Sequence, residues 1–466
     1  MSKRPAAHSL TITLYVPAKY TRLFDNLVYL VAIFKVVSAM GFYQSEYWLS
    51  DTWGANRQER RSGTYRPYVP DSLCSASLAL TAETAAAVSR AQTDIALLNA
   101  NAQHLTDTEP LARLILRAEA VASSKIEGLE ISAGKLLEYE ALDELGVRHR
   151  LDSTEAAVLA NIGAMRQSIT SATLNPPLSV TSICDINAML LAGTDMEPFS
   201  GILRDRQNWI GGNNVNPLGA AYVPPKPEYV HEFMDDLVTF INTSPLPPLA
   251  VAAIAHAQLE TIHPFADGNG RTGRAIVHAI LRKAGLTTQV TPPISLILAT
   301  DKDRYISNLA AFRTDNTDSS RTVQETMNDW VEYFARMTSE ACSRAQQFET
   351  ALADIQSTWA ERTKPRANSA ASILISRLIG SPVVSIESAA RLTGRSYEAA
   401  RNAIASLTNA GVLTQNARNR KSNLYVAKDV VDAFTHYERS LATVSGDTKE
   451  ERPARAVPQR TPRNTR

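Results

Sequence analysis

The sequence predicts a mainly α-helical fold with one β-hairpin and a small C-terminal unit of helices and strands. Three observations support this fold class. Long alanine- and leucine-rich stretches carry apolar residues at helical spacing. A short run of polar residues and glycines, 263–274, separates two such stretches. Beyond residue 363 the pattern changes to three short helices followed by two short strands.

The overall composition narrows the class of protein. The chain has 466 residues, enough for two or three domains that each bury a core. Its formal net charge of +1 gives no general attraction to nucleic acid or to a membrane surface. Cys74, Cys184 and Cys342 show no spacing typical of a metal site and fit a reducing compartment. We therefore expect a cytoplasmic protein without a membrane partner.

Residues 1–60 differ from the rest of the chain. The apolar run 27–40 is too short to cross a membrane, and Lys35 interrupts it. It also lies late for a signal peptide and has no convincing cleavage pattern. We interpret 1–60 as a leader that is poorly structured or an artefact of a start before Met40, and favour this over a membrane anchor.

Two consecutive helical regions are expected after the leader. We place them at 61–170 and 171–362, because Asn-Pro-Pro at 175–177 interrupts the helical pattern. The expected helices of the first region are 80–105, 111–145 and 154–168. Those of the second region are 182–191, 248–262, 271–284, 303–312 and 323–362.

The segment 263–274, with the sequence HPFADGNGRTGR, combines groups that together suit a bound nucleotide. Amide groups at the start of a helix have no partner within the helix, and glycines let a phosphate approach them closely. Arg271 and Arg274 lie three residues apart on one helix face, where both can bind phosphate oxygens. Asp267 offers a carboxylate for Mg2+, and His263 can accept a proton near neutral pH.

These groups predict a site that holds a nucleotide with Mg2+ and activates a hydroxyl to attack it. Each group has a structural alternative, since a histidine beside a proline and a Gly-Asn-Gly turn are common on their own. The Gly-Lys-Ser/Thr ending of a Walker A loop is absent. The combination in this order makes a nucleotide site the stronger interpretation.

The same segment resembles the signature of the Fic domain family, His-x-Phe-x-Asp/Glu-Gly-Asn-Gly-Arg-x-x-Arg, at every specified position. Most members of this family are protein adenylyltransferases, which move AMP from ATP onto a Ser, Thr or Tyr hydroxyl of a target protein. The resemblance therefore implies a Fic-type helical bundle with a β-hairpin flap. It also implies ATP and Mg2+ as cofactors and a target protein as partner.

The resemblance implies roles for individual residues as well. His263 would be the general base that deprotonates the target hydroxyl, and Asp267 would bind Mg2+. Phe265 would be buried and hold the loop in place. Ile306 stands where the family often has a second aromatic residue of the adenine pocket. The residues expected to bind the nucleotide, the first three as an anion hole, are Gly268, Asn269, Gly270, Arg271, Arg274, Tyr305 and Asn308.

The sequence SSKIEG at 123–128 resembles the family's inhibitory-helix motif, Ser/Thr-x-x-x-Glu-Gly. The resemblance implies that Glu127, helped by Ser123, pairs with Arg274 and prevents the γ-phosphate of ATP from binding productively. The alternative is an ordinary helix end closed by Gly128.

Apolar runs on both sides of Gly-Gly-Asn-Asn at 211–214 predict a β-hairpin. Residues 201–204, 209–210 and 221–225 around it resemble the family's flap, on which an extended target segment docks by strand addition. A hairpin with a structural role alone is the alternative. The residues expected to dock the target are Arg204, Trp209, Ile210 and Tyr222.

Residues 367–434 resemble a winged helix-turn-helix, with helices at 373–378, 385–392 and 396–410 and strands at 412–413 and 423–426. Many such units bind protein instead of DNA, and that alternative stays open. The tail 447–466 is rich in proline and arginine, and we expect it to be disordered. The expected DNA contacts are Tyr397, Arg401, Asn402, Arg418, Arg420 and Lys421.

Three hypotheses of function follow. The first is a self-inhibited protein adenylyltransferase, in which Glu127 restrains the transfer of AMP. The second is a de-AMPylating hydrolase, in which Glu127 positions a water against a modified target. The third is a transcription regulator that senses nucleotide, although the intact base at His263 argues against it. Neither the residues nor the resemblance decides between a monomer and a homodimer.

Overall fold

The computed structural model describes residues 41–50, 56–57, 60–101, 109–146, 151–173, 177–313, 322–416 and 423–440, all of which belong to one compact unit. Within these residues the chain is mainly helical, as predicted. The helices before the C-terminal unit are α2 (Ala82–Asn101), α3 (Glu109–Ile126), α4 (Ala133–Glu144), α5 (Ser153–Thr173), α6 (Val180–Leu191), α7 (Pro227–Thr243), α8 (Pro248–Ile262), α9 (Asn269–Lys283), α10 (Ile294–Leu298), α11 (Lys302–Phe312) and α12 (Val323–Thr363). No helix of this described part is long and apolar enough to span a membrane.

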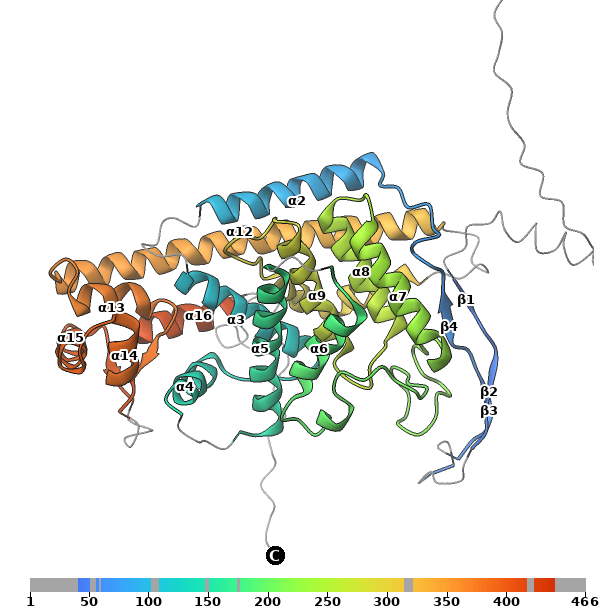
Figure 1. The fold of residues 1–466 in the computed structure, drawn as a ribbon, viewed down its shortest axis with the longest axis horizontal. Coiled ribbons are helices and arrows are strands. Elements are labelled where there is room, and N and C mark those ends of the chain that lie inside the picture. Colours follow the sequence, from blue (N-terminus) through green and yellow to red (C-terminus); the bar gives the residue numbers. More distant parts are fainter. Residues whose placement is uncertain are drawn as a thin grey trace, which may run out of the picture. The chain divides into compact units, whose positions relative to one another are not determined.

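Helices α8 and α9 form the centre of the bundle. Every residue of α8 from Leu249 onward is buried, which its alanine-rich sequence permits because small side chains let neighbouring helices approach. The indole Nε1 of Trp330 on α12 donates to the carbonyl of Ala253 at 2.8 Å. Helix α2 runs along the other side of α12 (Figure 1). The rigid pair α8–α9 therefore carries the loop that the sequence singles out.

Helix α3 is held against the same centre by a buried polar network. Glu119 is fully buried, and its carboxylate accepts from His278 Nε2 on α9 and from the backbone N–H of Ser295, both at 2.7 Å. These contacts satisfy a carboxylate that would otherwise be costly to bury. They also determine where the end of α3, with Glu127 beside it, meets α9.

One expected helix, 111–145, is divided in the structure. Helix α3 ends at Ile126 and α4 begins at Ala133. Gly128 has a φ of 82° in the segment between them, a conformation that ends an α-helix and that glycine adopts without strain. Helices α7 and α10 are additions to the expected set.

Two short antiparallel pairs form an N-terminal ribbon, which we define as residues 41–48 and 63–70. Strand β1 (Gly41–Tyr43) pairs with β4 (Tyr68–Pro70), and β2 (Glu46–Trp48) pairs with β3 (Gly63–Tyr65). Here the structure differs from the leader expected over 1–60, because aromatic side chains find partners across the ribbon and on the flap. The Trp48 ring, for example, lies 5.8 Å from that of Trp209. Residues 1–40 lie outside the described part.

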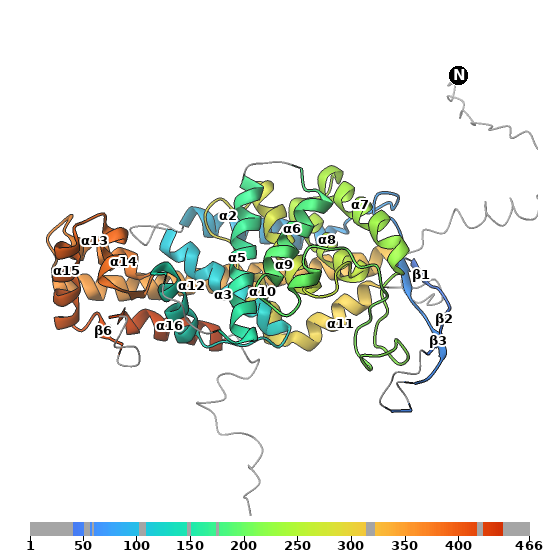
Figure 2. The ribbon, with the colours of Figure 1, turned by 60° about the horizontal axis from the view of Figure 1, so that its bottom comes forward.

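The C-terminal unit contains α13 (Ala370–Leu378), α14 (Ile386–Thr393) and α15 (Tyr397–Asn409), which lie together beside the end of α12 (Figures 1 and 2). A three-stranded antiparallel sheet follows, in the order β5 (Val383–Val384), β7 (Tyr425–Val426), β6 (Thr414–Gln415). The expected strand 412–413 is displaced to β6, because the backbone N–H groups of Val412 and Leu413 both donate to the carbonyl of Leu407 in α15. Helix α16 (Lys428–Ser440) extends past the expected boundary at 434.

The C-terminal unit contacts the start of α3 directly. Arg117 Nη1 donates to the carbonyl of Gly380 at 2.6 Å. A Cβ on Gly380 would lie 2.4 Å from the Cα of Pro110, so only glycine allows this approach. The tail 447–466 lies outside the described residues.

Candidate active site

A cavity of about 600 Å³ opens over the loop between α8 and α9, within the usual size range of ligand sites. The end of α3, the α8–α9 loop and one face of α11 contribute to its lining. Further lining comes from Tyr43 of the ribbon and from residues 209–211 and 221–222, which belong to the predicted flap. Segments that are far apart in the sequence therefore meet over the polar loop.

His263 follows the last residue of α8 and has a left-handed backbone, with φ 49° and ψ 58°. The guanidinium of Arg204 holds this conformation, because its Nε donates to the carbonyl of His263 at 2.9 Å and its Nη2 to that of Ile262 at 3.3 Å. Arg204 is only 8% exposed. It therefore caps α8 and is not available on the surface to dock a target, contrary to the sequence prediction.

Two side-chain amides cover the Nδ1 edge of the His263 ring. Asn208 Nδ2 lies 3.0 Å from Nδ1, and Asn269 Nδ2 lies 3.2 Å from it. Burial, together with the positive charges of Arg313 and Arg204, lowers the pKa of His263 to about 3. The imidazole is therefore neutral at physiological pH and can accept a proton.

Asn269 also organises the loop. Its Oδ1 accepts from the backbone N–H of Phe265 and its Nδ2 donates to the carbonyl of Phe265, both at 2.9 Å. The side chain of Phe265 is fully buried beneath the loop. In this structure the Asn269 side chain thus holds the loop, which leaves the backbone amides beside it as the groups that can accept an anion.

The start of α9 forms a cradle with free donors. Gly268 precedes the helix with a φ of 78°, and a Cβ on Gly270 would lie 2.2 Å from Glu127 Oε1. Arg271 Nη2 donates to Asp267 Oδ2 at 3.2 Å. Its Nε and Nη1 are buried and have no hydrogen-bond partner among the residues that the structure describes. Buried donors without partners at a helix N-terminus suit a phosphate.

Arg274 joins the two motifs that the sequence separates by almost 150 residues. Its Nη2 lies 2.7 Å from Glu127 Oε1, and its Nε donates to Ser123 Oγ at 2.8 Å. Burial alone would raise the pKa of Glu127, but the adjacent Arg274 holds it below its usual range. The carboxylate is therefore charged and paired.

The Mg2+ prediction rests on one carboxylate. The Asp267 side chain is 48% exposed at the cavity and paired with Arg271. Within the described part of the chain, no three His, Cys, Asp or Glu side chains cluster as a metal site. A magnesium ion shared between one carboxylate and nucleotide phosphates needs no such cluster, so Asp267 fits that mode of binding.

Comparison with known proteins agrees with this geometry. Residues 177–281 match the Fic/DOC family, and residues 85–170 match the Fic/DOC family N-terminal region. This chain carries a Fic/DOC domain. The matched regions include α3 and end within α9, so the ribbon and α10 to α16 lie outside them.

Curated proteins similar to this chain include "Protein adenylyltransferase fic-1" of Caenorhabditis elegans, 32% identical over 133 residues, which are 28% of this chain and 23% of that protein. "Protein adenylyltransferase Fic" of Drosophila melanogaster is 31% identical over 119 residues, or 25% of this chain and 22% of that protein. The match thus spans less than a quarter of either relative.

Solved structures of similar chains include a Fic family protein from Desulfovibrio desulfuricans G20, with 20% identity and a TM-score of 0.46 over 75% of this chain and 97% of that chain. Fic-1 from C. elegans has 22% identity and a TM-score of 0.42 over 56% of this chain and 73% of that chain.

Glu260 is a residue of the Fic/DOC cavity that the sequence analysis missed. It is 8% exposed, and burial raises its pKa to about 7, with the negative charge of Glu127 as the next cause. A charged residue near the end of an alanine-rich helix without other charged side chains was the available signal. Asn208 was missed too, and nothing in the sequence around it marks its contact with His263.

The two expected adenine-pocket residues are placed differently. Tyr305 is 2% exposed, lines the cavity, and its hydroxyl lies 2.8 Å from His256 Nε2. Asn308 does not line the cavity, because its side chain donates to the carbonyl of Arg304 on its own helix. The role of Asn308 in nucleotide binding therefore stays a prediction, whereas Ile306 does line the cavity.

The flap contains one β-bridge, Ile210 to Tyr222, in place of the predicted hairpin around 211–214. The intervening residues make their own turns, since Asn213 Oδ1 accepts from the backbone N–H groups of Val215 and Asn216. Ile210 is 39% exposed, whereas Tyr222 is buried and donates to the carbonyl of Thr261 at 2.6 Å. Trp209 Nε1 donates to the carbonyl of Asn213 at 2.6 Å.

The expected DNA contacts remain a prediction. Tyr397 is 51% exposed at the start of α15, and Arg401 and Asn402 are exposed on the same helix. Arg401 pairs with Glu398 at 3.3 Å. The remaining expected contacts, Arg418, Arg420 and Lys421, lie outside the described residues.

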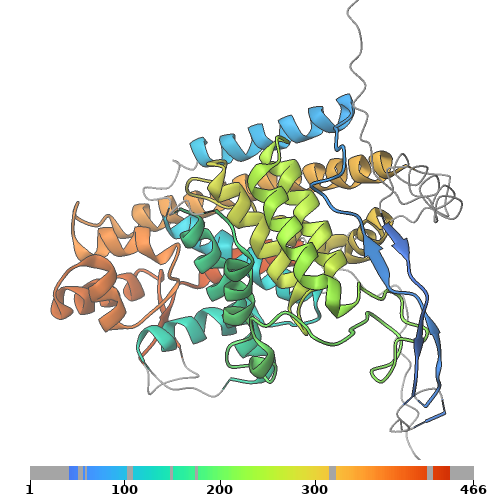
Figure 3. The same ribbon diagram turned by 45° about the vertical axis from the view of Figure 1, so that its right-hand side comes forward.

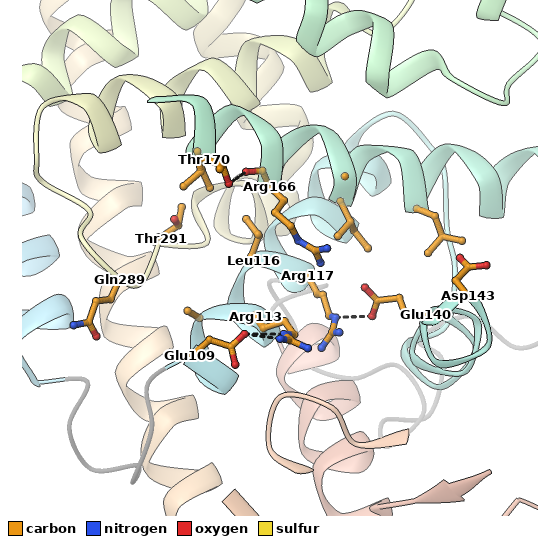
Figure 4. A pocket seen from close by; sticks show the side chains of 15 residues that line it. Glu109, Arg113, Leu116, Arg117, Glu140, Asp143, Arg166, Thr170, Gln289 and Thr291 are labelled. Carbon is orange, nitrogen blue, oxygen red and sulfur yellow. Dashed lines mark hydrogen bonds and ion pairs between the residues drawn. The ribbon is translucent and has the colours of Figure 1, made fainter. Parts of the chain in front are cut away.

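A second cavity, of about 680 Å³, lies away from the motif among α3, α4 and α5 (Figure 4). Its arginines Arg113 and Arg117 each pair with a carboxylate at 2.5 Å, that of Glu109 and that of Glu140. Arg166 of α5 lines the same cavity.

Proposed function

We propose that this chain transfers AMP from ATP to a Ser, Thr or Tyr hydroxyl of a target protein and that Glu127 restrains the transfer. The observation that carries the proposal is the 2.7 Å pair between Glu127 and Arg274, which joins the two motifs in one cavity. The names of the similar curated proteins, protein adenylyltransferases, support the same activity.

The phosphates of ATP would occupy the cradle at the start of α9. The two partnerless nitrogens of Arg271 gain acceptors there, and the first amides of α9 gain an anion. Mg2+ held by Asp267 and the phosphates would neutralise part of the phosphate charge. Tyr305 and Leu309 of α11 line the cavity beside Arg274 and offer an apolar wall for the adenine ring of ATP.

His263 would act as the base. The target hydroxyl oxygen bonds to the α-phosphorus, its proton passes to the imidazole, and pyrophosphate leaves with the electrons of the broken P–O bond. A pKa of about 3 makes His263 a weak base in the free protein. Bound phosphates carry negative charge that raises this pKa, so base strength develops only with nucleotide in place.

Glu127 would restrain the reaction by occupying Arg274. Unit charges about 4 Å apart interact by roughly 4 kcal/mol at an effective dielectric near 20, before desolvation is subtracted. A net preference of about 1.4 kcal/mol for the closed pair suffices to hold activity down tenfold. The γ-phosphate competes for the same guanidinium.

De-AMPylation is the second candidate, and one observation favours it. The Glu127 side chain is 40% exposed and lines the cavity, so its carboxylate can hold a water opposite the α-phosphorus of a modified target. In this reaction the water oxygen replaces the target oxygen on phosphorus, and AMP is released.

The deciding experiment incubates the full chain with alpha-labelled ATP and cell lysate. We expect the Glu127→Gly protein to label targets and itself at least about tenfold more than the wild type, and the His263→Ala protein to lose about 100- to 10,000-fold. Lys125→Gly, a glycine substitution in the last turn of α3 two residues before Glu127, is the matched control and leaves labelling unchanged. Equal labelling by wild type and Glu127→Gly would contradict the restraint. Loss of AMP removal from a pre-labelled target in Glu127→Gly would favour the hydrolase.

A further inference from the structure

A smaller cavity, of about 280 Å³, lies between the N-terminal ribbon and the flap. Tyr43, Ala221 and Tyr222 line both this cavity and the motif cavity, so the two are direct neighbours. Figure 3 brings this side of the molecule forward, with the ribbon beside the flap. The ribbon lies outside the regions that match the Fic/DOC family, so this cavity is an addition to the matched fold.

The ribbon is fixed to the flap. The backbone N–H of Tyr68 donates to the carbonyl of Val223 at 2.9 Å, as one strand does to the next. Lys226 Nζ pairs with Glu46 Oε1 at 2.5 Å. The Trp48 and Trp209 rings pack edge to face at 5.8 Å. The cavity between them is therefore a built surface, because its two walls are tied at several points.

The charge of this cavity is positive. Arg66 lines it, is exposed, and has its guanidinium over the Tyr43 ring at 5.1 Å. Within the described residues it makes no ion pair. The nearby carboxylate of Glu46 is already neutralised by Lys226. Arg313, which lines the neighbouring motif cavity, lies over the Tyr222 ring that the two cavities share, 3.7 Å from its centroid.

We propose that the cavity between ribbon and flap binds an acidic side chain of the target, two residues from the acceptor hydroxyl. This inference rests on the proposed AMP transfer. An extended segment whose hydroxyl reaches His263 projects the side chain two residues away on the same side, about 7 Å along. Since the two cavities share a wall, that side chain enters the smaller one. There Arg66 provides a charge-assisted hydrogen bond.

The test uses synthetic 11-residue peptides that hold one threonine in an alanine and glycine background. Glu, Gln or Lys stands two residues before or after the threonine. The full-length Glu127→Gly protein labels the peptides from alpha-labelled ATP. We expect the better Glu peptide to be labelled about three- to tenfold faster than its Lys counterpart. Arg66→Gln removes the preference, and Arg66→Glu reverses it in favour of Lys.

The matched control is Arg61→Glu, which changes an exposed arginine of the same N-terminal segment that does not line the cavity. We expect the Arg61→Glu protein to label the Glu peptide faster than the Lys peptide, as the unchanged protein does. Labelled peptides without a preference, or a Glu preference that survives Arg66→Glu, would overturn the inference while leaving AMP transfer intact. No labelling of peptide, lysate or the chain itself would reject the proposed function, and the inference with it.

Discussion

The motif cavity and the α3–α5 cavity have similar volumes, about 600 and 680 Å³, yet their buried arginines differ in whether their nitrogens have partners. In the α3–α5 cavity Arg113 and Arg117 each have a carboxylate partner (Figure 4). In the motif cavity Arg271 has two buried nitrogens without a partner. Glu260 there has a pKa raised to about 7 by burial and by Glu127.

This difference teaches that volume alone does not mark a site. A buried donor without a partner costs about 1 to 3 kcal/mol, so a folded protein keeps one where a ligand restores the bond. In the α3–α5 cavity the arginines of α3 are paired, Arg117 with Glu140 of α4 and Arg113 with Glu109 of its own helix. In the motif cavity Arg274 is paired with Glu127, whereas Arg271 keeps two buried nitrogens that have no partner among the described residues.

The largest expected effect in this comparison comes from Arg271→Gln, which removes the charge of the partnerless side chain. We expect the Kd for ATP to rise about 10- to 150-fold, because hydrogen bonds from a charged group to phosphate contribute roughly 1.5 to 3 kcal/mol. Calorimetric titration of ATP into the Glu127→Gly protein, with and without the change, measures this. An unchanged Kd would show that the free nitrogens do not face the nucleotide.

The groups of the motif cavity were predicted from the sequence to very different degrees. Residues 263–274 are contiguous, so the order of His263, Asp267, Arg271 and Arg274 carries most of the information in one segment. The ion pair between Arg274 and Glu127 was predicted from a second local motif, residues 123–128. Helices were predictable for the same reason, since apolar periodicity is a local property.

Contacts between distant segments were not predictable in this way. The sequence predicts that Arg204 docks the target at the flap surface. In the folded protein Arg204 is buried and caps the end of α8. Asn208 meets His263 only because the flap folds over the loop. The strands of residues 41–48 depend on partners at 63–70, and no local pattern marks that pairing. Local propensity is overruled wherever such partners exist.

A second effect is expected on stability, through Glu260. In the folded protein its pKa is about 7, above the 4.5 of an ordinary glutamate. Between these values the folded state binds the proton and the unfolded state does not, so the free energy of unfolding falls as pH rises. The loss is roughly 3 kcal/mol at most, at about 1.4 kcal/mol per pH unit. Urea unfolding of wild type and Glu260→Gln at pH 5 and pH 8 measures it. A difference between the two proteins that does not change with pH would contradict the assignment.

The smallest effect is expected from Arg166→Gln, which makes in the α3–α5 cavity the change that Arg271→Gln makes in the motif cavity. Arg166 is exposed, and its guanidinium makes no ion pair with the carboxylates around the described cavity, all of which lie on other elements (Figure 4). Water satisfies an exposed guanidinium, so removing its charge should alter the free energy of unfolding by no more than about 0.5 kcal/mol. The Kd for ATP and the labelling rate of the Glu127→Gly protein should stay within about twofold of their values without the change.

The two substitutions, Arg271→Gln and Arg166→Gln, remove the same charge from cavities of similar size, so the ratio of their effects on ATP binding isolates the contribution of the partnerless nitrogens. A comparable loss in both would mean that the charge of the whole domain, rather than the cradle at α9, attracts the nucleotide.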